Sequence, residues 1–296
     1  MNSLEHIHKD FRHVVGFSDA DRIHFINEKR WIGYDQAHHI LDTMQNLMQM
    51  PKRTRMPSLL VVADSNNGKS TIVERFKDIY GQAYVNDNSD PVKPVIVAES
   101  PPAADEKGLL VSILEQFYAP YRATDPVVKL RYQVIHLFRS CHTQILIIDE
   151  FHSLVTGTAI KQREVMNAIK LLCNELKIPI VGVGTREAVR ALHTDPQHAS
   201  RFDVITLPTW ELNKSFQRLL AAFETVLPLK LESQLHLPET ATLLHTISEG
   251  NIGNLHSLLR QCAIKAIRSG QEQITKDIIE EHKWIRPTRG IREVQL

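Results

Sequence analysis

The chain contains the stretch Leu59-Leu60-Val61-Val62-Ala63-Asp64-Ser65-Asn66-Asn67-Gly68-Lys69-Ser70-Thr71, an apolar run that turns into a polar loop ending in Gly-Lys-Ser. The apolar run is typical of a buried strand, and the apolar spacing after Ser70 predicts one face of a helix. Unpaired backbone N–H groups and the positive end of the dipole at a helix N-terminus favour a polyphosphate. We therefore expect a phosphate-binding loop, in which Lys69 reaches the β- and γ-phosphates of a nucleotide and the Ser70 hydroxyl binds Mg²⁺.

The loop follows the pattern G-x-x-x-x-G-K-[ST] except at its first position, where Ala63 replaces glycine. Alanine is the smallest side chain that could take this place, and Gly68 is present where the backbone must approach phosphate. The alternative is an ordinary strand, turn and helix with a surface lysine. The residues expected to contact nucleotide are Ala63, Asp64, Ser65, Asn66, Asn67, Gly68, Lys69, Ser70 and Thr71.

A second motif makes that alternative less attractive. The sequence Ile145-Leu146-Ile147-Ile148-Asp149-Glu150 is an apolar strand that ends in two carboxylates, the form of a Walker B element. Asp149 is expected to hold Mg²⁺ through water or Ser70, and Glu150 to orient and polarise the attacking water. A solvated strand end remains the other interpretation of the Asp-Glu pair.

Composition sets limits on the class of protein. The chain has 296 residues, 43% of them hydrophobic and 23% charged, which is typical of a soluble globular protein of one or two domains. A formal net charge of +1 excludes a globally basic nucleic-acid binder, so any DNA contact must come from local patches. The three cysteines look like buried thiols, and no apolar run reaches the length of a membrane span. We expect a cytoplasmic protein without membrane contact.

Strand and helix patterns alternate as far as Pro208, which predicts an α/β fold with a five-stranded parallel sheet. Beyond Pro208 only helical patterns appear. The expected domains are an N-terminal arm (1–30), a nucleotide-binding α/β domain (31–208), a helical lid domain (209–283) and a basic C-terminal tail (284–296). The polar segment 81–91 is expected to be a loop.

An apolar turn, Trp31-Ile32-Gly33-Tyr34, precedes the amphipathic helix expected from Asp35 to Met50. In a nucleotide-binding protein, Ile32 and Tyr34 could form a wall of the adenine pocket. A hydrophobic staple at the start of the helix is an equally good interpretation.

Taken together, the parallel sheet, the two phosphate-site motifs and the C-terminal helices resemble the AAA+ ATPases. Finer stretches resemble the TniB family of transposition ATPases, relatives of TnsC; they are Arg30-Trp31-Ile32-Gly33-Tyr34, Arg55-Met56-Pro57, Asp64 to Ser70 and Val181 to Ala188. The likeness covers roughly residues 25 to 270. It implies a homo-oligomeric, ATP-dependent accessory protein that assembles on duplex target DNA and recruits or activates a DDE-type transposase, with a target-selection accessory protein as a further partner.

The resemblance also implies roles for single residues. Thr185 matches the sensor 1 position near the γ-phosphate, although it could instead cap the next helix. Arg201 matches an arginine finger that completes a neighbouring subunit's site, although a lone arginine is more often a surface residue. Where many AAA+ lids carry a sensor 2 arginine, this chain has Gly250-Asn251-Ile252-Gly253-Asn254. A lid without that arginine is expected to sense the γ-phosphate weakly. Slow hydrolysis would suit a switch better than a motor.

Local basic residues are the candidates for DNA contact. Lys107 matches a DNA-facing region of the TnsC relatives, and Lys52, Arg53 and Arg55 form a basic connector before the first strand. Each could equally be a solvated surface charge.

The leading hypothesis is thus an ATP-driven assembly switch on DNA. One alternative with the same fold is an ATPase for replication loading or secretion. Another is a nucleotide-binding scaffold that does not turn over, against which Glu150 argues.

Overall fold

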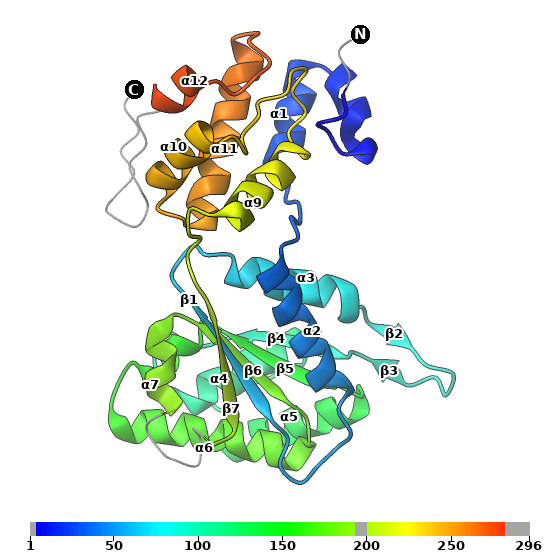
Figure 1. Cartoon of the computed structure of the whole chain (residues 1–296). Helices are drawn as coiled ribbons and strands as arrows, with labels where there is room; N and C mark the ends of the chain where they lie inside the picture. The colour runs from blue at the N-terminus through cyan, green and yellow to red at the C-terminus, as the bar shows by residue number, and fades with distance from the viewer. Residues whose placement is uncertain (1–3, 193–199, 282–296) are drawn as a thin grey trace. The chain divides into compact units, whose positions relative to one another are not determined.

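A computed structural model describes residues 4–192 and 200–281, and they form two compact units (Figure 1). Of the described residues, those within Asp35–Asp64 and Lys69–Pro208 form the sheet unit, and those within Met1–Tyr34, Ser65–Gly68 and Thr209–Leu296 form the helical unit. The short segment Ser65–Gly68, within the phosphate-loop stretch, therefore groups with the helical unit.

The sheet unit is built on five parallel strands in the order β4-β5-β6-β1-β7. Their bounds are Ser58–Ala63 for β1, Val95–Glu99 for β4, Ile145–Asp149 for β5, Ile180–Gly184 for β6 and Phe202–Leu207 for β7. Because the strands are parallel, all their carboxyl ends lie at one edge of the sheet, and the ends of β1 and β5 carry the two motifs. The predicted five-stranded parallel sheet is confirmed.

Helices cover both faces of this sheet. Residues that alternate along the strands, such as Leu60 and Val62, pack into one apolar core with α4 (Glu106–Gln116), α5 (Val127–Ser140) and α6 (Ala159–Leu176). The opposite face carries α2 (Asp35–Gln49) and α3 (Lys69–Tyr80). The continuous apolar character of β1 and β5 reflects burial on both faces.

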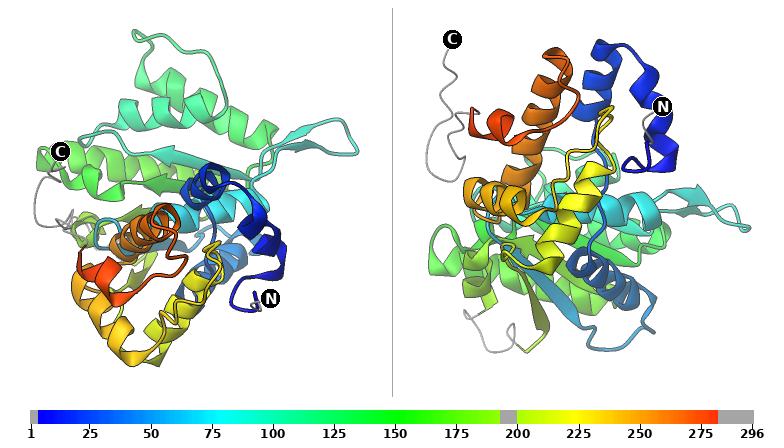
Figure 2. Two further views of the ribbon diagram at one scale, coloured as in Figure 1. Left: turned by 90° about the horizontal axis from the view of Figure 1, so that it is seen from above. Right: turned by 45° about the horizontal axis from the view of Figure 1, so that its top comes forward.

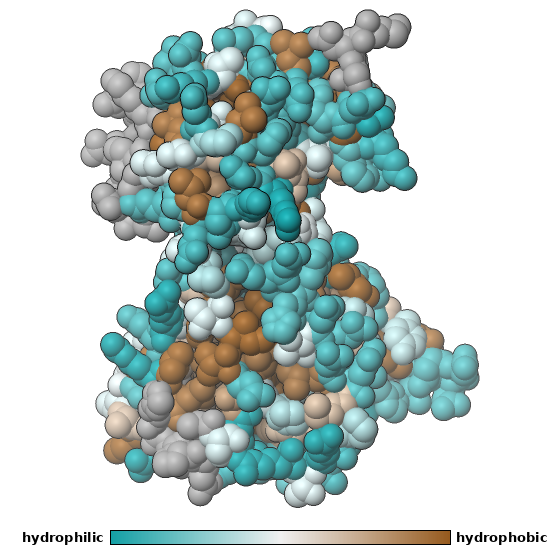
Figure 3. Space-filling view, viewed as in Figure 1, coloured by the Kyte–Doolittle hydropathy of each residue, from teal (hydrophilic) through white to brown (hydrophobic). Residues whose placement is uncertain are grey.

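Three short helical segments and one hairpin complete the sheet unit. The segments are η2 (Phe151–Val155), η3 (Arg186–Ala188) and α7 (Val189–Leu192). The region expected to be a loop holds two short antiparallel strands, β2 (Tyr84–Val85) and β3 (Pro91–Val92), which stand clear of the sheet (Figure 2). On the face shown in Figure 3, apolar residues gather where the edge strand β7 lies, and Val204 is 44% exposed there.

The helical unit packs around α11 (Ile252–Arg268), whose buried residues recur with helical periodicity. The other helices from its C-terminal part are α9 (Lys214–Glu224), α10 (Pro238–Ser248) and α12 (Lys276–Glu280), in line with the helical patterns expected beyond Pro208. Pro238 is the first residue of α10. Proline suits that position because its missing N–H would have no helical partner there.

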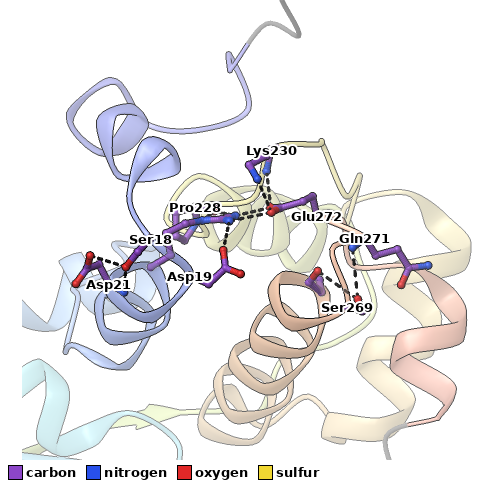
Figure 4. A network of polar contacts seen from close by, with 10 residues as sticks. Ser18, Asp19, Asp21, Pro228, Lys230, Ser269, Gln271 and Glu272 are labelled. Atoms are coloured by element: carbon purple, nitrogen blue, oxygen red, sulfur yellow. Dashed lines mark hydrogen bonds and ion pairs between the residues drawn. The ribbon is translucent and has the colours of Figure 1, made fainter.

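The range expected to be an N-terminal arm, residues 1–30, is described from residue 4 onward. Its segments η1 (Lys9–Gly16) and α1 (Asp19–Asn27) belong to the helical unit, and α1 packs against α11. Arg22 is fully buried there. Its guanidinium pairs with Glu272 and donates to the carbonyl oxygen of Pro228 at 2.7 Å. Lys230 lies 2.8 Å from Glu272 (Figure 4).

Remaining expectations have mixed outcomes. Cys173 and Cys262 are buried, but Cys141 is only half-buried. The basic tail (284–296) lies outside the described residues. Among the helices of residues 4–192 and 200–281, none combines the length and apolar character that a membrane crossing needs.

Candidate nucleotide-binding site

The phosphate-loop lysine lies at the carboxyl end of β1 in the sheet unit. Ala63 is the last residue of β1 and pairs with Leu207, so a side chain is tolerated at the position where the pattern has glycine. Lys69 begins α3, and its ammonium donates to the carbonyl oxygens of Ala63 at 3.1 Å and Asp64 at 2.8 Å. Burial lowers the pKa of Lys69, against the opposing effect of Glu150, Asp149 and Asp64. A buried cation with only carbonyl partners is well placed to exchange them for phosphate oxygens.

The two motifs meet at one hydrogen bond. The hydroxyl of Ser70 donates to Oδ2 of Asp149 at 3.0 Å, and the backbone N–H of Glu150 donates to the other carboxylate oxygen at 2.8 Å. A hydroxyl beside a fixed carboxylate is the donor set that Mg²⁺ uses in nucleotide sites, where phosphates and waters supply the remaining ligands. Ser70 and Asp149 thus fit this metal.

Glu150 stands at the turn that leaves β5. Its φ of 53° is left-handed, and it directly precedes η2. Its Oε2 lies 3.3 Å from Nε2 of His152, a contact that the sequence alone did not indicate. The glycines of β6 make room for this turn, because a Cβ on Gly182 would lie 2.7 Å from the Phe151 ring and one on Gly184 would lie 3.0 Å from the His152 nitrogen.

Thr185 follows β6 at the same edge of the sheet. It occupies the N-cap position of η3, but its side chain makes no capping hydrogen bond. Its hydroxyl is buried and has no hydrogen-bond partner among the residues that the structure describes. A buried hydroxyl is normally paired, so this one is a candidate to meet a ligand or water. The hydroxyl of Ser100, which follows β4, is in the same situation and was not anticipated.

The tip of the loop, Ser65–Gly68, is held within the helical unit by the N-terminus of α11. The N–H of Gly253 donates to the carbonyl oxygen of Asn66 at 3.0 Å. The Asn66 amide donates to Asn254 at 3.1 Å, and the Asn251 amide donates to the carbonyl oxygen of Ser65 at 3.0 Å. The segment that stands where many lids have a sensor 2 arginine therefore contacts the loop through backbone and amide groups.

Tyr34 also reaches this loop tip. A Cβ on Gly68 would lie 3.7 Å from the Tyr34 hydroxyl, and the Tyr34 ring packs edge-on against Trp210 with centroids 5.2 Å apart. Burial raises the pKa of Tyr34 to about 12. Ile32 packs beside them against the apolar core of the helical unit. Both residues therefore pack on the helical unit, and their role as a wall of the adenine pocket stays a prediction.

Arg201 lies at the opposite edge of the sheet from Lys69. It directly precedes β7, whose first residue Phe202 pairs with Ser58 at the amino end of β1. Its guanidinium donates to the Asn174 side chain at 2.8 Å. The length of β1, about 17 Å for five steps of a strand, separates this edge from the phosphate loop of the same chain.

The candidate DNA residues do not form one patch. The connector Lys52, Arg53 and Arg55 precedes β1 at the amino edge, and Arg55 donates to the carbonyl oxygen of Ser200 at 3.1 Å. Lys107 is in the first turn of α4, beyond the carboxyl end of β4, and its ammonium donates to the carbonyl oxygen of Ala123 at 2.6 Å.

Several solved structures of other proteins share this fold. The ORC2 protein of Aeropyrum pernix, described as ADPNP–ADP complexes, superimposes with a TM-score of 0.63 at 15% identity, covering 89% of this chain and 72% of that one. Cdc6p of Pyrobaculum aerophilum gives a TM-score of 0.61 at 12% identity, covering 90% and 70%. A Thermotoga maritima RuvB variant gives 0.51 at 16% identity, covering 87% and 72%. At such identities the likeness shows the fold, which is that of the AAA+ proteins.

No curated protein matches the sequence. The family model described as bacterial TniB protein does match, over residues 22–212. That range covers the whole sheet unit, both nucleotide motifs and parts of the helical unit. The chain therefore belongs to the TniB family.

Proposed function

We propose that this protein binds and hydrolyses ATP with Mg²⁺ and acts as an ATP-driven assembly switch in transposition. The observation that carries the proposal is the 3.0 Å hydrogen bond from Ser70 to Asp149, with the Lys69 ammonium on neighbouring loop carbonyls. Nucleotide-dependent assembly, target DNA and a DDE-type transposase are part of the proposal and are supported by membership of the TniB family.

Each residue of the site suits one part of the hydrolysis. Lys69 would neutralise the β- and γ-phosphates, and Glu150 would polarise a water whose oxygen bonds to the γ-phosphorus as the bond to the bridging oxygen breaks. Mg²⁺, held through Ser70 and Asp149, would neutralise phosphate charge. The unpaired hydroxyl of Thr185 would contact the γ-phosphate or the water, which is the sensor 1 role.

Arg201 suits a role in a neighbouring subunit. It lies a strand length away from the phosphate loop of its own chain, so its guanidinium cannot reach that loop. In a homo-oligomer, however, the amino edge of one subunit could face the nucleotide of the next. Hydrolysis would then depend on assembly, which is the property that a disassembly switch needs.

Two variants test the proposal together. Lys69→Ala should abolish tight ATP binding, whereas Glu150→Gln should keep binding and lose phosphate release, because one residue neutralises charge and the other acts on water. Binding is measured with a fluorescent ATP analogue. Equal loss of binding in both variants would contradict the division of roles, and an unmodified protein that binds but never releases phosphate would be a scaffold.

Assembly is tested separately by electron microscopy. The unmodified protein and Glu150→Gln are imaged with duplex DNA and either ATP or ADP. Ordered oligomers on DNA with ATP alone, which persist in Glu150→Gln, are the expected result. Oligomers that do not depend on the nucleotide would contradict the switch.

A further inference from the structure

His152 is a residue near the reaction centre for which neither the motifs nor the family supplies a role. It lies two residues after Glu150 in η2, and its side chain is 26% exposed. Its Nε2 approaches the Glu150 carboxylate to 3.3 Å. Gly184 of β6 leaves room for this residue, since a Cβ at Gly184 would lie 3.0 Å from the His152 backbone nitrogen and 3.4 Å from its Nδ1.

The two ring nitrogens of His152 have different surroundings. Nε2 faces the carboxylate, whereas Nδ1 is buried and has no hydrogen-bond partner in the part of the chain that the structure describes. A proton on Nδ1 would be a buried donor without an acceptor, which is costly. Of the two tautomers of the neutral ring, the one with its proton on Nε2, the nitrogen 3.3 Å from Glu150 Oε2, is therefore favoured.

Glu150 benefits from such a partner. Its side chain is 44% exposed, and a free glutamate in that setting samples several rotamers. A neutral donor can hold one carboxylate oxygen and leave the other for water. A cationic partner such as Lys or Arg would instead weaken the carboxylate as a base.

We propose that His152 is a positioning residue for ATP hydrolysis: its Nε2–H holds the Glu150 carboxylate in the orientation that polarises the attacking water. The inference rests on the proposed function of Glu150 and assigns His152 no contact with ATP. Loss of the contact should therefore slow the chemical step and leave nucleotide binding intact.

A pair of substitutions separates the donor from the shape of the ring. His152→Phe keeps a flat ring without a donor, and His152→Gln places an amide N–H near the position of Nε2. We expect His152→Phe to keep its affinity for an ATP analogue and to lose roughly 10- to 100-fold in kcat, the scale of a misplaced catalytic group. His152→Gln should recover most of that loss.

Control variants at a second histidine complete the kinetic test. The same two substitutions at His136, which is exposed on α5, should leave kcat unchanged. An unchanged kcat in His152→Phe, or a kcat in His152→Gln as low as in His152→Phe, would overturn the proposal.

Ring ¹⁵N spectra report the contact even if the unmodified protein proves not to hydrolyse ATP, an outcome that would overturn the proposed function itself. The signal that disappears in His152→Gln should show a proton on Nε2, and Glu150→Gln should shift it while leaving the His136 signal in place. A proton on Nδ1, or no shift, would show that His152 does not hold Glu150.

Discussion

The N–H of Gly253 donates a 3.0 Å hydrogen bond to the carbonyl oxygen of Asn66, and the two residues are in close contact. A Cβ on Gly253 would lie 2.3 Å from the Asn66 side-chain oxygen and 2.4 Å from its carbonyl oxygen. Any side chain at position 253 must therefore displace the tip of the phosphate loop. The N-terminus of α11 and the tip of the phosphate loop therefore cannot move independently.

Gly253→Ala should accordingly weaken ATP binding without unfolding the protein. Displacing Asn66 disturbs the backbone N–H groups that are expected to surround the phosphates. We expect a loss of about 10-fold or more in affinity, measured with a fluorescent ATP analogue, because one of the crowded atoms is a backbone oxygen that cannot rotate away. Gly16→Ala is the matched control, since nothing lies within 4 Å of its Cβ position. Equal affinities in the two variants would show that the loop adapts freely.

The sequence alone was enough to predict the two motifs that each lie at the end of a single strand. The motifs at Lys69 and Asp149 fix both the chemistry and the strand ends, so the parallel sheet brings them together without further information. Contacts between distant segments left no such signal. Asn254 and Asn66 are far apart in sequence, and the side chain of an uncharged asparagine does not indicate which distant residue it pairs with.

The sequence analysis did not predict the hairpin of β2 and β3 or the packing of α1 on the helical unit, for two different physical reasons. β2 and β3 have two residues each, too few for an alternating pattern to appear. The association of α1 with the helical unit depends partly on Arg22, and a buried arginine cannot be distinguished by composition from a solvated one. His152 did have a possible signal, the spacing Asp-Glu-x-His, but only the structure shows which way its ring faces.

The buried pair of Arg22 and Glu272 should make the helical unit sensitive to acid. Burial by itself would raise the pKa of Glu272, but hydrogen bonds from Arg22 and Lys230 outweigh it and lower the pKa from 4.5 to about 2. The unfolded chain therefore takes up the proton first as the pH falls, so this group's contribution is complete above pH 4.5 and is lost towards pH 2.

Glu272→Gln tests this contribution. It leaves the Arg22 charge buried without its carboxylate, and removal of one partner of a buried pair costs about 3 to 5 kcal/mol. Denaturant unfolding followed by the fluorescence of Trp31 and Trp210, both in this unit, should show that loss at pH 7 and a smaller loss at pH 3. Glu280→Gln, which removes an exposed pair with Lys276, should change little. A loss in Glu272→Gln that is equally large at both pH values would contradict the linkage.

DNA contact should involve only one of the two candidate groups, because they lie at opposite edges of the sheet. Removing one lysine or arginine that binds a phosphate should reduce the slope of log affinity against log salt by about one per subunit bound. We expect Lys107→Ala to lower the slope, because Lys107 lies beyond the carboxyl ends of the strands, the edge that carries the nucleotide motifs. The triple alanine variant of Lys52, Arg53 and Arg55, at the amino edge, should leave the slope unchanged.

Fluorescence anisotropy with duplex DNA and a non-hydrolysable ATP analogue gives these slopes. Lys276→Ala, on α12, serves as the control for the removal of one exposed lysine. A reduced slope in the connector variant alone would place the DNA surface at the amino edge. Unchanged slopes in all variants, with nucleotide binding intact, would exclude both groups.

Arg201 gives the most direct test of catalysis across a subunit boundary. Arg201→Ala should bind ATP normally and release phosphate slowly, because the transition-state charge loses its cation in trans; such a finger is worth about 10³-fold or more in related chemistry. Arg55→Ala is the matched control, since it removes a neighbouring guanidinium at the same edge.

Mixing Arg201→Ala with Glu150→Gln then distinguishes action in trans from action in cis. Each variant alone lacks one component of every site, but in mixed oligomers some interfaces pair an intact Glu150 with an intact Arg201, so phosphate release should reappear and peak near equal amounts. Subunit exchange is verified with fluorescently labelled protein. If mixed oligomers form and activity stays absent at every ratio, Arg201 does not complete a neighbouring site, and its bond to Asn174 would be its structural role.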